Sequence, residues 1–446
     1  MLGVRSLPPA RPQLAETHGR VLTVWAGPTP VVVLSGFRAV KEALVSNSEQ
    51  FSGRPLTPLF CNLFGERGPC APPLPTWRRA HLQQRAQQRR FCLTTLRALG
   101  LGRPALELQL QDEAAELAEA FRREQGRAFD PQVLLVRSTA RAIGALAFGH
   151  RFRSEEPIFQ ELTQAADFGL AFVSTVWRRA VDDPVSTFSE ENLIQVVMDL
   201  FLGGTDTTLR WVLVYVVQHG AVQERVQQEL DAVLGTAPTV RYEDRKRLPF
   251  TRAVLHEVQR LSSVVAVGTV RQCVTSTSVC GFYVPKGTVI LPNLASVLCD
   301  PERWETPHQF NPGHLLDKDG SFVVNEAFLP FSAGHRMCPG DQLARMELFL
   351  MSATLLRTFR FQLPEGTPGL SLEYAFGGTL QPQPQEICAV PLRSSCSPSP
   401  GPSGEGLSLA GVFPSLPCSL QPEKRTDGGS PSCPAHGLPN TSSGWR

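Results

Sequence analysis

One ten-residue segment, Phe331–Gly340, constrains the fold of this chain more than any other feature. Its sequence, FSAGHRMCPG, places Cys338 directly before a proline and close to a helix-forming stretch, Leu343–Phe359. Proline suits the first position of a helix, and the free N–H groups and dipole at a helix N-terminus stabilise a thiolate. The sequence therefore predicts a loop that presents a cysteine sulfur at the start of a helix.

The neighbours of this cysteine suit a flat, negatively charged ligand. Gly334 and Gly340 have no side chain, so the backbone can approach such a ligand closely. Arg336 suits a carboxylate on the ligand, and Phe331 is placed to shield the sulfur from water. The alternative for a lone cysteine is a buried, inert thiol followed by a helix. Together with Cys338, these residues fill five fixed positions, which a chance match rarely does.

The pattern resembles the haem-binding loop of cytochromes P450, in which a thiolate is the protein ligand of the haem iron and favours O–O cleavage. The resemblance implies that Cys338 is the axial, metal-binding ligand of haem b (iron protoporphyrin IX). It also implies that Arg336 and Arg271 bind haem propionates, with Arg89 as a further candidate. The nearest group is the microsomal, drug-metabolising family two, and the likeness extends from about residue 14 to 393.

Two further motifs follow the order expected for this family. The segment LHEVQR contains Glu257 and Arg260, an i,i+3 pair on one helix face that is otherwise typical of a solvated surface bridge. In the family this pair is buried and structural, and His314 in FNPGHLL stands where its third member belongs. The segment GGTDTT resembles the distal-helix motif, with Asp206 and Thr207 at the proton-delivering positions. Without the cysteine loop, a core helix kinked at its glycines is the simpler interpretation.

Periodicity and turn residues predict a mainly α fold with a small β-rich subdomain. Helices are expected over residues 37–45, 77–91, 106–123, 131–148, 155–177, 193–217, 223–233, 250–261 and 343–359. Strands are expected as a hairpin over 21–34 and as short runs within 264–291 and 362–392. The implied architecture is the cytochrome P450 fold in incomplete form.

Four departures from the family pattern define that incompleteness. The N-terminal membrane anchor is expected to be missing, and residues 1–13 form an irregular leader. Trp77 stands twelve residues before Arg89, too far for the family's W-x-x-x-R box, which marks an altered segment near 65–88. A deletion near 180 removes the helices that roof the substrate cavity. Beyond the family-like domain, 14–393, lies a tail, 394–446, in which 29 of 53 residues are Pro, Gly or Ser. Such a tail is expected to be disordered.

Composition excludes several other classes of protein. The net charge of +2 argues against a nucleic-acid partner, which demands a basic surplus. No run approaches the roughly 18 apolar residues of a membrane span. The 11 cysteines are odd in number and lack C-x-x-C spacing, so a reducing compartment fits better than a disulfide scaffold, and no zinc-site spacing is present.

The resemblance implies an unspecific monooxygenase that hydroxylates small apolar molecules (xenobiotics, steroids or fatty acids) with O2. Electrons are expected from an NADPH-cytochrome reductase, a flavoprotein, and also from cytochrome b5. The alternative is a catalytically inactive, truncated relative with weak or no haem binding. The implied location is the cytosolic face of the endoplasmic reticulum membrane, with contact to the membrane surface. A cytoplasmic location is the alternative if the anchor is missing.

Basic side chains are expected to face the acidic reductase, and a solvated charged surface is the alternative for them. They are Arg78, Arg79, Arg85 and Arg345. A third interpretation is an interaction protein that acts through the Pro-rich tail, 394–446.

Overall fold

The structure is a computed structural model of the whole chain. It describes residues 17–55, 104–148 and 206–392, without 27 and 377–378, together with residues 15, 94, 97 and 156. The predicted helices over 77–91 and 155–177, the altered segment near 65–88, the deletion near 180 and the tail all lie outside the described residues. Within the described part, no helix is both long and apolar enough to cross a membrane.

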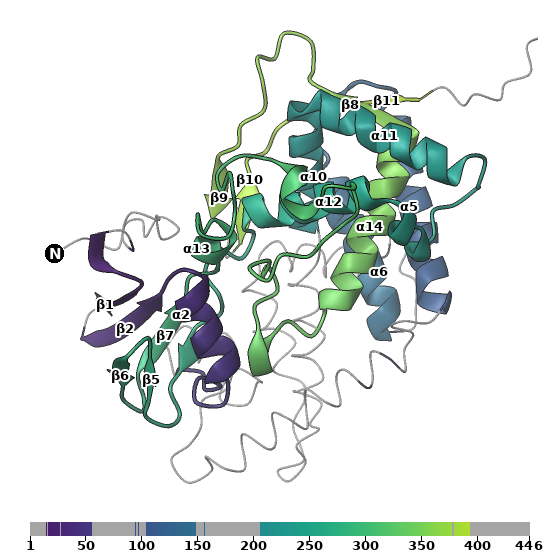
Figure 1. Cartoon of the computed structure of the whole chain (residues 1–446). Helices are drawn as coiled ribbons and strands as arrows, with labels where there is room; N and C mark the ends of the chain where they lie inside the picture. The colour runs from purple at the N-terminus through teal and green to yellow at the C-terminus, as the bar shows by residue number, and fades with distance from the viewer. Residues whose placement is uncertain are drawn as a thin grey trace, which may run out of the picture. The chain divides into compact units, whose positions relative to one another are not determined.

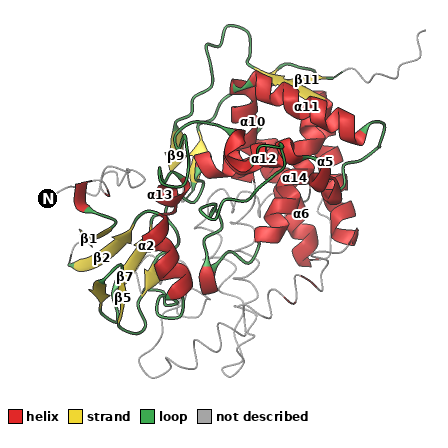
Figure 2. Cartoon of the chain, viewed as in Figure 1, coloured by secondary structure: helices red, strands yellow, loops and turns green. Residues whose placement is uncertain are grey.

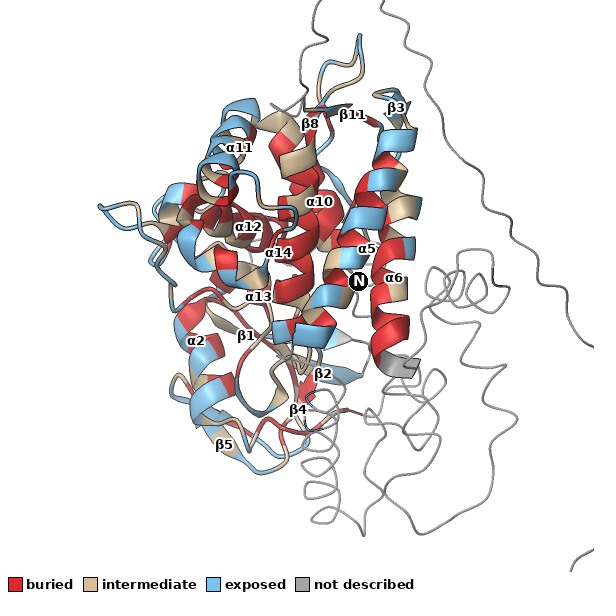
Figure 3. Ribbon diagram, turned by 90° about the vertical axis from the view of Figure 1, so that its right-hand side faces the viewer, coloured by how far each residue is buried: buried red, intermediate tan, exposed pale blue. Residues whose placement is uncertain are grey.

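The larger of two cores belongs to a group of helices, shown in Figures 1 and 2. Its apolar side chains come mainly from helices whose sequences carry the 3.6-residue spacing of one buried face. These helices are α5 (Pro104–Arg123), α6 (Gln132–Phe148), α10 (Asp206–Gln218), α11 (Gly220–Leu234), α12 (Pro249–Ser262) and α14 (Asp341–Thr358). Helix α10 is buried along most of its length, as Figure 3 shows, because it packs against α6, α11, α12 and α14.

The second core lies under a small sheet. The strand order is β1 (Val21–Ala26), β2 (Thr29–Leu34), β7 (Val289–Pro292) and β4 (Arg271–Gln272). Strands β1 and β2 form the predicted antiparallel hairpin, while β2 pairs in parallel with β7 from the distant second half of the chain. Helix α2 (Phe37–Lys41), which continues as a π-helical turn, η1 (Glu42–Ser46), contributes Phe37 and Leu44 to the core.

The remaining elements are short, and several of them add side chains to one of the two cores. Strands β3 (Ala128–Phe129), β11 (Ile387–Pro391) and β8 (Phe359–Gln362) form one sheet. Two antiparallel pairs are β5 (Thr277–Val279) with β6 (Phe282–Val284), and β9 (Tyr374–Phe376) with β10 (Leu380–Pro382). Short helices are η3 (Tyr242–Arg247), α13 (Leu294–Leu298), η4 (Pro312–Leu315) and η5 (Gly334–Arg336).

The observed elements confirm the predicted class, mainly helical with small sheets. The predicted helices over 106–123, 131–148, 223–233, 250–261 and 343–359 are all present, with ends shifted by no more than three residues. The predicted helix over 193–217 is described only from Asp206 onwards, as α10. The described part therefore has the architecture that the sequence predicts.

Candidate active site

Cys338 lies on a tightly hydrogen-bonded loop that leads into helix α14. The Cys338 N–H donates to the carbonyl of Phe331 at 3.0 Å, and the Met337 N–H donates to the carbonyl of Gly334 at the same distance. Two residues of the loop, Ser332 and Gly334, have positive φ angles of 63° and 70°. The sulfur-bearing residue is half-buried and stands three positions before the start of α14 at Asp341. The backbone thus fixes the cysteine at the positive end of a helix dipole.

Gly334 makes the closest backbone approach in this loop. A Cβ built at this position lies 1.6 Å from the backbone carbonyl oxygen of Leu44, on the π-helical turn η1. The motif predicts that this glycine allows close approach of a flat ligand. The structure shows a close approach between two segments of the chain itself, in which Gly334 docks the cysteine loop on η1.

Replacing Gly334 by alanine is expected to destabilise the protein by about 3 kcal/mol or more, because a left-handed φ and a backbone clash act together. Gly366 is the matched control, since its φ is 79° but a Cβ there meets nothing within 4 Å. Gly366→Ala therefore reports the cost of φ alone. Urea unfolding of both variants measures the difference, and equal losses would show that the contact with Leu44 has no separate effect.

Two arginines lie against the cysteine loop. Arg271 opens strand β4 with 3% of its surface exposed, and its Nη2 donates to Ser332 Oγ at 3.2 Å and to the Arg336 carbonyl at 3.4 Å. The Nε of Arg336 donates to the carbonyl of Ser52 at 2.9 Å. The Arg271 guanidinium is thus tied to the cysteine loop, whereas that of Arg336, itself a residue of the loop, is tied to the carbonyl of Ser52. Their positive charge favours an anionic ligand and a thiolate.

The predicted proton-delivery residues lie at the first turn of helix α10. Thr207 is buried, and its Oγ1 lies 3.5 Å from a carboxylate oxygen of Asp206, longer than a typical O–H···O bond. Helix α10 is fixed further along, since Trp211 Nε1 and Arg210 Nη2 each donate at 2.9 Å to carbonyls of strand β10. The hydroxyl and the carboxylate are therefore neighbours on a rigid, buried helix that also packs against α14.

Glu257, Arg260 and His314 converge in a fully buried cluster. Arg260 donates through Nε and Nη2 to the two carboxylate oxygens of Glu257, at 2.8 Å each, and both side chains have no exposed surface. His314 Nδ1 lies 3.1 Å from Glu257 Oε1. The backbone N–H of Thr306 donates to His314 Nε2 at 3.1 Å, so this nitrogen is an acceptor and Nδ1 carries the proton. Nδ1 of the histidine thus donates to the carboxylate of Glu257.

The cluster also holds the loop that precedes the cysteine segment. Arg260 Nη1 and Nη2 donate to three carbonyls, those of Leu298, Pro307 and Gln309, at 2.7–3.0 Å. The Asn311 N–H donates to Glu257 Oε1 at 2.9 Å. Sequence reasoning missed these backbone partners, because carbonyls carry no residue-specific signal. The i,i+3 pair on α12 therefore fastens a segment about fifty residues further along the chain.

The other predicted residues differ in how far the structure describes them. Phe331 is half-buried, and the guanidinium of Arg345 lies over its ring at 4.9 Å. A Cβ at Gly340 would lie 3.9 Å from the sulfur of Cys338, at ordinary contact distance. Arg89 lies outside the described residues. Sequence reasoning missed the carbonyl of Ser52 as a partner of Arg336, since no local pattern links such distant segments.

Comparison with known proteins assigns the class. The family model described as cytochrome P450 matches residues 10–182 and 165–389. Cytochrome P450 2D6 of Homo sapiens is 38% identical over 445 residues, covering 85% of this chain and 88% of the relative. Cytochrome P450 2D27 of Mesocricetus auratus is 36% identical over 441 residues, with 84% and 87% covered. Cytochrome P450 2J5 of Mus musculus is 36% identical over 440 residues, with 85% and 86% covered.

The chain belongs to the cytochrome P450 family and resembles its family-two members. The family implies a haem-thiolate group, and the described residues fit one. The donor set is a single thiol before the start of a helix, Arg271 donates to the same loop, and the loop's own Arg336 is held by the carbonyl of Ser52. A thiolate ligand with cations for two carboxylates is the set that haem would need.

Proposed function

We propose that this chain is a haem-thiolate monooxygenase that hydroxylates small apolar molecules such as xenobiotics, steroids or fatty acids. The balanced reaction is RH + O2 + two electrons + two protons, giving ROH + H2O. One observation carries the proposal: the loop that holds Cys338 at the start of α14, fixed by its N–H bond to Phe331 and flanked by Arg271 and Arg336.

Haem b, when bound through Cys338, supplies the O2 chemistry. The chain's own residues do the rest. The backbone bond from Cys338 to Phe331 holds the sulfur in one orientation, and α14 directs its positive end toward it. Arg271 and Arg336 would neutralise the propionates. The Asp206 carboxylate would take a proton from water, and the buried Thr207 hydroxyl, 3.5 Å from it, would pass a proton on toward the substrate side.

The proposed electron donor is an NADPH-dependent flavoprotein reductase, and cytochrome b5 is a proposed second donor. Of the four predicted basic contacts, Arg345 lies on α14 in the described part, where it is half-buried close to the cysteine loop. Arg78, Arg79 and Arg85 lie outside the described residues. The proposed location is the endoplasmic reticulum membrane, as is typical of microsomal family-two proteins.

Replacing Thr207 by alanine is expected to lower product formed per NADPH consumed about tenfold or more, because positioned proton transfer contributes factors of this size or larger. Thr207→Ser keeps the hydroxyl and is expected to recover most of the yield. The measurement is product and NADPH in the same reconstituted reaction. A normal ratio in Thr207→Ala would remove this residue from the proton path.

The experiment that tests the function is turnover of the full chain with reductase, NADPH and a panel of apolar substrates. Hydroxylated product that depends on all components supports the proposal. Haem incorporation without product, or no haem incorporation, supports the inactive alternative. The family model matches this chain in two pieces that overlap over residues 165–182, which supports a proposed deletion near 180 and makes this alternative worth the test.

A further inference from the structure

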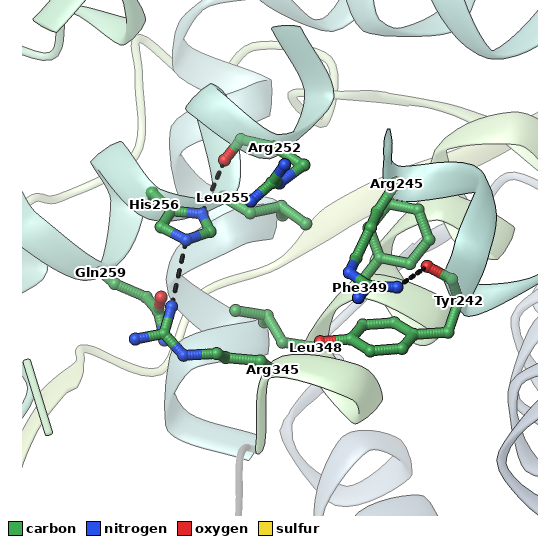
Figure 4. Close-up of a pocket in the computed structure, with 9 residues that line it drawn as sticks. All are labelled: Tyr242, Arg245, Arg252, Leu255, His256, Gln259, Arg345, Leu348 and Phe349. Carbon is green, nitrogen blue, oxygen red and sulfur yellow. Dashed lines mark hydrogen bonds between the residues drawn. The ribbon is translucent and has the colours of Figure 1, made fainter. Parts of the chain in front are cut away.

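A pocket lies between η3, α12 and α14, and Figure 4 shows the side chains that line it. Its volume is about 70 Å³. Three guanidiniums line it, one from each element: Arg245, Arg252 and Arg345. Since one water occupies roughly 10–15 Å³ on the same measure, the space takes several waters or one small polyatomic ion.

The pocket carries positive charge with no carboxylate among its lining residues. Burial lowers the pKa of Arg252, and the charges of Arg245 and Arg345 lower it further. The nearby acids have other partners, since Glu243 pairs with Lys246 and Asp244 pairs with Arg247. Two acids still act on the cluster: Asp341 on Arg345, and Glu243 on Arg245. The three guanidinium charges thus lie close together, and the anionic side chains around them do not balance their full positive charge.

The histidine of the pocket adds no charge of its own. Burial is the main reason that the pKa of His256 falls to about 3. Its Nδ1 lies 2.8 Å from the carbonyl of Arg252, so Nδ1 carries the proton, and its Nε2 accepts from Arg345 Nη1 at 3.1 Å (Figure 4). The neutral imidazole therefore orients Arg345 and adds no charge of either sign to the pocket.

Aromatic rings fix the planes of two of the arginines. The guanidinium of Arg252 lies over the ring of Phe322 at 3.9 Å, and that of Arg245 lies over Tyr242 at 3.7 Å. Within the described part of the chain, Arg252 donates no side-chain hydrogen bond, and Arg245 donates one, to the Tyr242 carbonyl. Stacked guanidiniums with donors to spare are pre-organised for an oxyanion.

We propose that this pocket binds the phosphate group of a small molecule or of a lipid headgroup. Tetrahedral phosphate presents acceptor oxygens in several directions, which suits donors that arrive from three separate elements, whereas a planar carboxylate matches one guanidinium fork at a time. The site is distinct from the proposed haem site, although Arg345 contacts the Phe331 ring of the cysteine loop and so joins the two.

The test is calorimetric titration of the full chain with inorganic phosphate, at constant ionic strength made up with chloride. We expect saturable 1:1 binding that weakens at least tenfold in Arg252→Gln. The matched control is Arg360→Gln, on the exposed side of strand β8, with binding unchanged. Arg252→Lys keeps the charge but lacks the planar guanidinium. Its phosphate affinity is expected to lie between those of the parent protein and Arg252→Gln. Far-ultraviolet circular dichroism checks each fold, and Arg245→Gln replaces Arg252→Gln if the latter is unfolded.

Three results would overturn the proposal: absence of saturable phosphate binding, equal weakening in Arg252→Gln and Arg360→Gln, or equal binding of chloride. Loss of reductase affinity in Arg252→Gln without any phosphate binding would also overturn it and would assign the arginines to an acidic side chain of that partner. A second experiment distinguishes a small molecule from a lipid headgroup as the source of the phosphate group. It compares binding of glycerol phosphate with binding to vesicles of phosphatidic acid and of phosphatidylcholine. Preference for either phosphate-monoester form over phosphatidylcholine supports the proposal.

Discussion

Replacing Cys338 by serine is expected to abolish the thiolate-type Soret band of the reduced, carbon-monoxide-bound protein. This band depends on sulfur as the axial ligand, and within the described part of the chain Cys338 is the cysteine held directly before helix α14. Serine keeps nearly the same volume and the N–H bond to the Phe331 carbonyl, so the loop itself is expected to survive. Loss of the band would then show that the Cys338 sulfur is the iron ligand, and it would not be explained by unfolding of the loop.

The control for this prediction is another half-buried cysteine. Cys280 lies between β5 and β6, where its N–H and thiol both contact the carboxylate of Glu42. Cys280→Ser is expected to leave the spectrum unchanged. A thiolate-type band that persists in Cys338→Ser would assign the iron ligand to a different residue. A parent protein that shows no such band would support the inactive alternative.

The sequence was most informative where the relevant interactions are local. Helices α5, α12 and α14 follow from their apolar spacing, and the β1–β2 hairpin follows from β-branched runs around Pro28 and Pro30. Each depends on contacts within a few residues, so the pattern carries almost all of the necessary information.

Long-range pairing was not predictable in this way. Strand β2 joins β7 in parallel across more than 250 residues, and nothing in either short run specifies the other. The docking of Gly334 on the carbonyl of Leu44 is of the same kind. The glycine was identified from the motif, but the reason for it became visible only when the two distant segments were placed together.

The residues of the candidate site show the same difference between what the sequence predicts and what it does not. The resemblance to the family implied that Glu257, Arg260 and His314 form one group, and the structure brings their side chains into contact. The pocket of Arg245, Arg252 and Arg345 had no such family pattern, because its members come from three elements and its character arises from shared space and charge. The spacing of residues alone predicted neither set of long-range contacts.

Replacing Glu257 by glutamine is expected to lower the free energy of unfolding by about 3–5 kcal/mol, because it leaves the buried Arg260 charge without a carboxylate to balance it. Typical domains are stable by only about 5–15 kcal/mol, so this one change brings the protein near the limit of folding. Urea unfolding at neutral pH measures the loss. Loss of the cooperative unfolding transition in Glu257→Gln would also show that the buried pair is required for stability.

Glu243→Gln is the control, since Glu243 and Lys246 form an i,i+3 pair of the same kind on the surface, 3.0 Å apart. Exposed pairs contribute little, so this variant is expected to match the parent. Equal stability of Glu257→Gln and Glu243→Gln would show that the buried pair has no structural role.

Removing both charges is not expected to restore stability. In many proteins a buried ion pair can be exchanged for apolar residues at little cost. Here Glu257→Leu combined with Arg260→Leu strands the carbonyls of Leu298, Pro307 and Gln309, and also the Asn311 N–H. Each unpaired buried group costs roughly 1–3 kcal/mol. The double variant should therefore be at least as unstable as Glu257→Gln, because the pair holds a backbone segment as well as itself.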